Sequence, residues 1–280
     1  MLALWTDRII CVSKHELKLA IEAGISRRRC TVVLTGLPEP GATRALVTRP
    51  APEPGCKRRV LFVGRFDHQK GFDIYLDVMR RLEGQAEGIA AGNAIVGKKL
   101  DFVIPPNVRT LGWCSPDQVS ALYYDADLIL MPSRFEGLPM VALEAMQSGT
   151  PIFASDAGPM REVVHDGVSG RLFPGASPEL MAAAIASITD AELRRFGEAG
   201  CRIFQERFTA DRMGRTMLEE YESVLGNVSA GGTGAAAKAI PFTRRSPPGS
   251  RRPSWRRRFA KGAHVEKLAT IFSRCFAGSK

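Results

Sequence analysis

Short apolar runs and amphipathic stretches alternate along this 280-residue chain, and their two periods predict different elements. The apolar runs predict strands near Arg8–Val12, Cys30–Leu34, Val60–Val63, Ala94–Val96, Val108–Leu111, Leu128–Met131, Ile152–Ala154 and Arg171–Phe173. The amphipathic stretches predict helices near Lys14–Ala23, Phe72–Leu82, Pro116–Asp125, Pro139–Ser148, Pro178–Ile188, Ala191–Glu206 and Asp211–Val224. Because strands alternate with helices, the sequence predicts an α/β fold with a Rossmann-like, doubly wound parallel sheet that binds ligands at the carboxyl ends of its strands.

The stretch 133–151 holds two glutamates, Glu136 and Glu144, on either side of a helix start. Pro139 marks that start and Gly149 marks the helix end, and Glu144 is the only charge between them. A carboxylate in an otherwise apolar helix is costly unless it has a partner or a ligand. Glu136 precedes the helix, where backbone N–H groups and the positive end of the helix dipole favour anions. This arrangement predicts a site for a phosphorylated, hydroxyl-rich ligand.

A second motif indicates the same ligand. The apolar strand Val60–Gly64 leads through Arg65, Lys70 and Gly71 into an amphipathic helix. Arg65 is a fork-shaped donor and Lys70 a point charge, and the two flank a turn at a helix start, which suits a diphosphate. The spacing is neither that of a Walker A loop nor that of the dinucleotide-binding GxGxxG.

The sequence GRFDHQKG followed by SRFEGLPMVALEAMQSGTP resembles the donor half of a GT-B glycosyltransferase of the retaining family 4, the glycosyl transferases group 1. The segments VRTLGWCSPDQVSALYYDADLILMPS and SDAGPMREVVHDGVSGRLFPGASPELMAAAI are similar to that family too, so the resemblance covers about Asp7 to Leu225. It implies an enzyme that transfers a sugar from a nucleotide-diphosphate sugar, with retention of configuration, to an acceptor that the sequence does not identify. It implies neither a cofactor nor a bound metal.

The resemblance also implies a donor-binding set near the strand ends: Gly64, Arg65, Lys70, Trp113, Glu136, Gly137, Leu138 and Glu144. Arg65 and Lys70 would hold the diphosphate of the donor. Glu136 would contact hydroxyls of the transferred sugar, and these three residues form the implied catalytic group.

The remaining members of the implied set would hold the nucleotide. Glu144 would bind the ribose, and the backbone N–H groups of Gly137 and Leu138 would complete the phosphate cradle. Trp113 would line the base pocket, and ordinary packing is the alternative explanation for it.

Three regions follow from the resemblance. Residues 1–40 resemble only the last β-α-β piece of the acceptor-binding domain of this family, residues 41–225 form the donor-binding Rossmann-like domain with C-terminal helices, and residues 226–280 form a tail. Three explanations of the short first region stay open: a fragment, a partner chain that supplies the N-terminal domain, or a reduced architecture. In the first two cases the chain would be a donor-binding half or a fragment that is inactive without a partner N-terminal domain. A further alternative keeps the donor site with water or phosphate as the acceptor, which would make a hydrolase or a phosphorylase.

The charge of the chain is concentrated in the tail. The net charge is +10, and residues 226–280 carry 12 Lys and Arg and one acid, Glu266. Stretches rich in Gly, Ser and Pro predict a flexible linker, and basic residues beside Trp255 and Phe259 predict contact with an anionic membrane surface. A disordered, solvated terminus is the alternative. The same charge would attract nucleic acid, but no recognition motif accompanies it, so no nucleic-acid partner is expected.

The remaining chemistry-bearing residues predict no further site. The six Cys residues form neither a CxxC pair nor a zinc spacing, which predicts reduced thiols in a cytoplasmic protein. Asp125-Ala-Asp127 has the form of a DxD metal motif but lies at a predicted helix–strand junction, so it is not expected to bind a metal. No apolar run is long enough to span a membrane. The predicted location is the cytoplasm, with membrane association through the tail.

Overall fold

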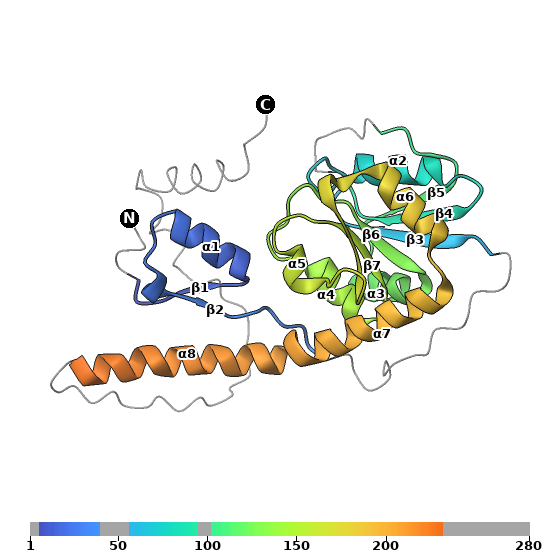
Figure 1. Ribbon diagram of the computed structural model, residues 1–280. Coiled ribbons are helices and arrows are strands. Elements are labelled where there is room, and N and C mark those ends of the chain that lie inside the picture. Colours follow the sequence, from blue (N-terminus) through green and yellow to red (C-terminus); the bar gives the residue numbers. More distant parts are fainter. Residues whose placement is uncertain (1–5, 40–55, 95–101, 232–280) are drawn as a thin grey trace, which may run out of the picture. The chain divides into compact units, whose positions relative to one another are not determined.

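The computed structural model of this chain describes residues 6–39, 56–94 and 102–231 (Figure 1). Six strands form one sheet: β3 (Arg58–Val63), β4 (Ala86–Ala91), β5 (Val108–Gly112), β6 (Leu128–Met131), β7 (Ile152–Ser155) and β8 (Gly170–Phe173). Their order across the sheet is β5-β4-β3-β6-β7-β8, and every neighbouring pair is parallel. This arrangement confirms the predicted Rossmann-like α/β fold.

Helices cover both faces of this sheet (Figure 1). One face carries α2 (Phe72–Arg81) and α6 (Pro178–Ser187), the other carries α3 (Pro116–Asp125) and α4 (Met140–Gln147), and α7 (Asp190–Arg207) contributes to both apolar clusters. Successive side chains of a strand point to opposite faces. In β3, Val60 and Phe62 accordingly join the α2 cluster, and Leu61 between them joins the α4 cluster. The two-sided apolar pattern of the central strands therefore produces the layered fold.

The side on which successive strands are added to the sheet changes between β3 and β6, although all strands remain parallel. From β3 the chain adds β4 and β5 on one side, then returns to place β6 next to β3, and adds β7 and β8 on the other side. The loops that follow β3 and β6 therefore leave the sheet on either side of this reversal of strand order, where open α/β sheets bind ligands. Residues 64–71 and 132–139 form these two loops.

Aromatic side chains anchor the loop after β3. The rings of Phe66 and Phe72 stack with centroids 4.1 Å apart, and both side chains are buried. Tyr75 donates its hydroxyl to the carbonyl oxygen of Val60 at 3.0 Å, and burial raises the pKa of Tyr75, so the hydroxyl keeps its proton. The buried rings hold both ends of the loop against the sheet.

A second, smaller sheet precedes the large one in the chain. It consists of β1 (Ile9–Cys11) and β2 (Cys30–Val32), which are parallel and are joined through α1 (Lys14–Glu22) and the 3-10 turn η2 (Arg27–Arg29). No residue of α1 is buried. The predicted boundaries of residues 1–40, 41–225 and 226–280 stay a prediction.

Several contacts join this N-terminal part of the chain to the C-terminal helices. The Thr31 hydroxyl donates to a carboxylate oxygen of Glu220 at 2.7 Å, and Glu220 lies in α8 (Ala210–Gly231). Further along the chain, Leu37 forms a parallel bridge with Thr209, the residue that precedes α8. The segment after β2 is therefore paired with the chain between α7 and α8.

The strand predicted near Ala94–Val96 differs in position from the strand that the structure describes in this region. The strand between β3 and β5 is β4, Ala86–Ala91, whereas Ala94 lies in no strand and residues 95–96 lie outside the described residues. Four of the six residues of β4 are Ala or Gly, which have low strand propensity, and the Ile-Val pair after Ala94 has a stronger local signal. Pairing with strands on both sides overrides this local preference.

Other differences concern element ends. The helix α5 (Met160–Val163) and the 3-10 turn η4 (Pro174–Ala176) are not predicted from the sequence, because such short turns have no periodic pattern. The helix α8 continues to Gly231, past its predicted end at Val224. Of the predicted basic tail, residues 226–231 lie in α8, and residues 232–280 lie outside the described residues, so the predictions for them stay predictions. In the described part of the chain, no helix is both long and apolar enough to cross a membrane.

Candidate functional site

The loops after β3 and β6 lie against each other at the reversal of the sheet. The backbone N–H of Arg134 donates to the carbonyl oxygen of Gln69 at 2.9 Å. Gly71 approaches the other loop so closely that a Cβ on it would lie 1.9 Å from the carbonyl oxygen of Pro132. The fold therefore brings the two sequence motifs into one site.

Lys70 and Glu136, 66 residues apart in sequence, form an ion pair at the centre of this site. The Lys70 ammonium donates to both carboxylate oxygens of Glu136 at 2.9 Å, and the Ser133 hydroxyl donates to Oε1 at 2.6 Å. Glu136 is only 3% exposed, and a buried carboxylate needs such partners. Lys70 has three donor hydrogens and a side chain that is 24% exposed, so its ammonium can reach a ligand as well as Glu136.

Arg65 lies in the same loop but is held by its own neighbours. Its guanidinium pairs with Asp67 at 3.1 Å and donates to the side-chain oxygen of Gln69 at 2.8 Å, and half of the side chain is exposed. Asp67 also accepts the backbone N–H of Lys70 at 2.8 Å. Gly64, the first residue of the loop, donates its N–H to the carbonyl oxygen of Ala91 in β4. Arg65 thus lies in the same turn as Lys70. Unlike Lys70, which reaches Glu136 in the other loop, Arg65 contacts only residues of its own loop through these interactions.

Arg134 fastens the two loops together. Its guanidinium donates to both carboxylate oxygens of Asp73 in α2 at 2.8 and 2.7 Å, and to the carbonyl oxygen of His68 at 2.7 Å. Burial raises the pKa of the Asp73 carboxyl, but the hydrogen bonds and the charge of Arg134 outweigh burial, so the pKa lies below its ordinary value. The bidentate pair therefore positions the Glu136 loop on the start of α2.

The Asp73–Arg134 pair predicts a pH-dependent stability. Because the Asp73 pKa is lower in the folded than in the unfolded chain, the stabilisation is complete above the unfolded pKa and is lost as the pH falls through the folded pKa. We expect Asp73→Asn to lower the free energy of unfolding by about 1 kcal/mol at neutral pH, since the pair is partly exposed. The difference from the wild type should shrink as the pH falls below the ordinary value of 3.8.

Urea unfolding at neutral pH and near pH 3 measures this difference. Asp125→Asn is the matched control, because Asp125 is an exposed aspartate at the opposite edge of the sheet. A loss of stability in Asp73→Asn that is the same at both pH values would contradict the prediction.

Glu144 has a partner on a neighbouring helix. The Tyr123 hydroxyl in α3 donates to Glu144 Oε2 at 2.8 Å, and Tyr123 is buried whereas Glu144 is half-buried in α4. Burial, followed by the nearby charge of Glu144, raises the pKa of Tyr123 well above its ordinary value, so the hydroxyl remains a donor. Tyr123 is therefore the partner that the Glu144 carboxylate requires in an otherwise apolar helix, and its hydrogen bond orients that carboxylate.

The helix α4 begins without a side-chain cap. Its N-cap residue is Pro139, and Gly137 and Leu138 immediately precede it. By contrast, hydroxyl side chains cap five other helices: Ser13 for α1, Ser115 for α3, Ser177 for α6, Thr189 for α7 and Thr209 for α8. The N–H groups of Met140 and Ala142 donate to the carbonyl oxygens of Leu138 and Pro139, both at 2.9 Å. The helix start therefore offers a ligand mainly the positive end of its dipole and the N–H groups of the residues that precede it.

Trp113 lies at the carboxyl end of β5, two strands away from β3. Its side chain is 74% exposed, so it does not belong to the packed core. Its place in the base pocket stays a prediction.

Sequence reasoning missed four residues that organise the site. Ser133 and Arg134 lie inside the recognised motif, and their polar side chains next to Glu136 were the available signal. Tyr123 gave no signal, because its contact with Glu144 depends on how α3 packs against α4. Asp73 was likewise one acid among several on an amphipathic helix.

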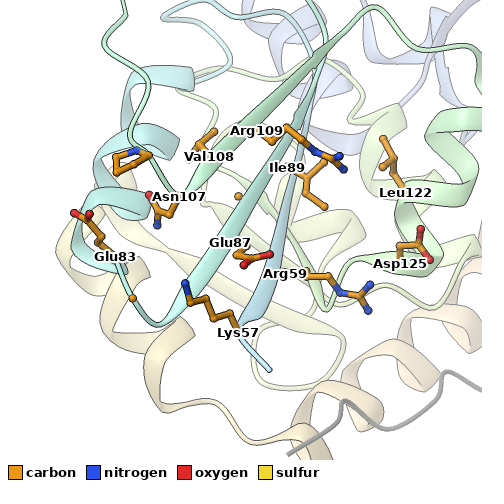
Figure 2. A pocket seen from close by; sticks show the side chains of 13 residues that line it. Lys57, Arg59, Glu83, Glu87, Ile89, Asn107, Val108, Arg109, Leu122 and Asp125 are labelled. Atoms are coloured by element: carbon orange, nitrogen blue, oxygen red, sulfur yellow. The ribbon is translucent and has the colours of Figure 1, made fainter. Parts of the chain in front are cut away.

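A hollow of about 810 Å³ lies elsewhere on the sheet (Figure 2). Its lining includes Lys57, Arg59, Glu87, Arg109 and Asp125, which come mainly from the amino ends of β3, β4 and β5. None of the eight implied donor-binding residues lines it. Since ligands of doubly wound sheets bind at the carboxyl ends of the strands, the loops around Lys70 and Glu136 are the better candidate.

Comparisons of the sequence with known proteins identify a family. The family model described as Glycosyl transferases group 1 matches residues 47–201. An uncharacterized 41.2 kDa protein in the cps region of Klebsiella pneumoniae is 30% identical over 232 residues, 80% of this chain and 63% of that protein. An uncharacterized glycosyltransferase of Methanocaldococcus jannaschii is 30% identical over 225 residues, 78% of this chain and 60% of that protein. The chain thus spans less than two thirds of the length of these relatives.

Solved structures with the same fold include HepE from Anabaena in complex with UDP and glucose. It matches with a TM-score of 0.66 and 20% identity, over 78% of this chain and 63% of that one. Sucrose-phosphate synthase from Thermosynechococcus elongatus matches with a TM-score of 0.67 and 23% identity, over 79% of this chain and 59% of that one. At these identities the likeness establishes the fold alone.

Proposed function

We propose that this chain, which belongs to the glycosyl transferases group 1 family, binds a nucleotide-diphosphate sugar and transfers its sugar to an acceptor with retention of configuration, as in family 4. The observation that carries the proposal is the ion pair of Lys70 and Glu136. This pair lies at the reversal of the sheet, next to the uncapped start of α4. A cation, a buried carboxylate and a helix start match the phosphate and hydroxyl groups of such a donor.

The diphosphate would bind between Lys70 and the start of α4. The Lys70 ammonium would bridge Glu136 and a phosphate oxygen, since it has a donor hydrogen beyond the two that Glu136 accepts. Backbone N–H groups of Gly137 and Leu138 would donate to the same phosphate group. Arg65 would add its fork of donors after it leaves Asp67 or Gln69.

The two glutamates would read the hydroxyl groups of the donor. Glu136 would accept hydrogen bonds from the transferred sugar while Lys70 and Ser133 hold its carboxylate in place. Glu144 would accept from the ribose while Tyr123 fixes one of its oxygens. Trp113 would supply a flat apolar surface for the base.

These residues would act mainly on the departing nucleoside diphosphate. Negative charge develops on its phosphate when the bond to the sugar breaks, and fixed cations and N–H groups stabilise that charge most in the transition state. Glu136 would orient the sugar and needs no proton transfer for this role. Retention is proposed from the family resemblance.

Titration calorimetry with UDP, GDP and ADP tests the donor site. We expect one nucleotide to bind the full chain, and we would test UDP first because HepE is solved with UDP and glucose. Lys70→Ala and Glu144→Ala should each weaken that nucleotide about 10-fold or more, the value of a lost charged hydrogen bond. Lys57→Ala and Glu87→Ala are the matched controls on the opposite edge of the sheet and should bind like the wild type. Absence of binding in a folded chain, or equal binding by all variants, would contradict the proposal.

A second candidate function is a donor-binding unit that needs a further domain for transfer. The two-stranded sheet favours it, because parallel sheets normally have both faces covered, whereas Ile9 and Ile10 of β1 are only half-buried and α1 buries no residue. Release of UDP from UDP-glucose in the presence of candidate acceptors discriminates the two. Nucleotide binding with turnover favours the enzyme, and nucleotide binding without turnover favours the donor-binding unit.

A further inference from the structure

Glu162 joins the small N-terminal unit to the large sheet domain. It lies in α5, and its two carboxylate oxygens accept the backbone N–H groups of Lys14 at 2.8 Å and His15 at 2.7 Å. Lys14 and His15 are the first two residues of α1, 148 and 147 residues away in sequence. The Glu162 carboxylate of the large sheet domain thus caps the start of α1 in the small unit.

Local side chains complete the first turn of α1. The Ser13 hydroxyl accepts the N–H of Glu16 at 3.0 Å, and the Glu16 carboxylate accepts the N–H of Val12 at 2.7 Å. Neither of these two hydrogen bonds uses the N–H groups of Lys14 and His15, the first two helical residues, which are therefore left for Glu162. Glu162 also places a negative charge at the positive end of the α1 dipole, so both hydrogen bonding and charge favour the contact.

The backbone around Glu162 is held rigidly. Met160 and Val163, the first and last residues of α5, are at most 1% exposed in the core beneath α4. The Arg207 guanidinium of α7 donates to the carbonyl oxygen of Glu162 at 3.1 Å. The backbone of Glu162 is therefore held in place by the core and by Arg207, so its carboxylate can restrain the start of α1.

The same segment touches the candidate site. A Cβ on Gly158, just before α5, would lie 2.6 Å from the carbonyl oxygen of Glu136, and the backbone there has φ = +58°, which favours glycine. The segment from Gly158 to Glu162 thus contacts the Glu136 loop at one end and α1 at the other. The start of α1 follows the carboxyl end of β1, the edge of the small sheet where a ligand of that unit would bind.

We propose that Glu162 is a positioning residue that fixes the start of α1, and with it the carboxyl end of β1, at a set place relative to Glu136. Its consequence for catalysis rests on the proposed function. The Leu37–Thr209 bridge and the Thr31–Glu220 hydrogen bond attach the small unit elsewhere. Loss of the Glu162 carboxylate should therefore make the start of α1 more mobile, while the contacts of Thr31 and Leu37 keep the rest of the small unit attached.

Amide hydrogen exchange of the full chain, read residue by residue by NMR, tests the contact. Glu162→Gln keeps the shape of the side chain but removes its charge and one acceptor, and it should speed exchange at Lys14 and His15 at least 10-fold. Glu162→Asp keeps the charge on a shorter stem and should restore part of the protection. Glu198→Gln is the control, because Glu198 is an exposed glutamate of α7, and it should leave both amides unchanged. Exchange in β6 checks that each variant remains folded.

Turnover provides the second readout. The rate of nucleoside diphosphate release from the nucleotide sugar should fall at least 10-fold in Glu162→Gln, whereas its Kd for the nucleotide should stay within twofold of the wild type. Unchanged exchange at Lys14 and His15 in Glu162→Gln would overturn the proposal, and so would faster exchange with unchanged turnover. A wild-type chain that binds no nucleotide would instead contradict the proposed function, and the exchange result would still decide whether Glu162 restrains α1.

Discussion

Lys70→Ala is expected to lower the rate of sugar transfer about 100-fold or more, with a smaller effect on binding of the donor. The ammonium of Lys70 lies at the reversal of the sheet, where the charge of the departing nucleoside diphosphate would develop. Its contribution should therefore be larger in the transition state than in the ground state. The kcat and KM for UDP-glucose, or for the donor that calorimetry identifies, measure this split.

Lys70→Ala should also destabilise the fold, because it leaves the Glu136 carboxylate buried with the Ser133 hydroxyl in place of a cation. Glu136 is 3% exposed, and removal of one partner from such a pair costs about 3 kcal/mol. The double variant Lys70→Ala/Glu136→Gln removes the uncompensated charge. We expect urea unfolding to show that the double variant regains much of the lost stability, whereas its transfer rate stays low.

The control for Lys70 is Lys57→Ala at the amino edge of the sheet. Lys57 is an exposed lysine that lines the hollow away from the candidate site, so its loss should change neither the rate nor the stability appreciably. If Lys70→Ala retained the kcat of the wild type, Lys70 would have no role in the transition state. If the double variant recovered both stability and rate, the effect of Lys70 would be structural alone.

Gly71→Ala is expected to separate the two loops of the site. Gly71 has φ = +68°, and a Cβ there would lie 1.9 Å from the backbone carbonyl oxygen of Pro132, which has no flexible end that could move aside. Overpacking and backbone strain together should lower the free energy of unfolding by about 3 kcal/mol. Nucleotide binding should be lost too, because the clash moves Lys70 away from Glu136.

Gly84→Ala provides the matched control for backbone strain. Gly84 has φ = +82°, but a Cβ there would meet no atom within 4 Å. It should therefore cost about 1 kcal/mol from strain alone and leave nucleotide binding intact. Equal losses in Gly71→Ala and Gly84→Ala, measured by urea unfolding and calorimetry, would show that the contact with Pro132 is unimportant.

Most of the large sheet could be predicted from the sequence. The strand β6 and the segments Val60–Val63 of β3 and Ile152–Ala154 of β7 are continuous apolar runs, because both faces of the sheet are covered by helices there. The prediction failed for β4, where Ala and Gly replace the usual strand formers and the neighbouring strands determine the conformation. It also failed for α5, whose four residues are too few to show a helical period.

The sequence predicts some residues of the candidate site but not the partners that hold them. Lys70 and Glu136 stand in motifs that follow apolar strands, and their positions after strand ends suggested a shared ligand before their contact was known. The partners that hold the carboxylates were less accessible. Tyr123 is one aromatic residue of an amphipathic helix, and its contact with Glu144 exists only because α3 packs beside α4.

Local patterns in the amino-acid sequence suffice to predict the α/β class, the strand–loop–helix units, and the placement of Lys70 and Glu136 in loops after strands, since propensity, periodicity and turn chemistry act over a few residues. Which of these loops meet depends on how the strands are ordered in the folded chain. The order of the strands places β3 beside β6, and this neighbourhood creates the Lys70–Glu136 pair. The contact of Glu162 with α1 joins residues about 150 positions apart, and no local pattern encodes such a pairing. It forms because the packing of whole elements brings a carboxylate to a helix start.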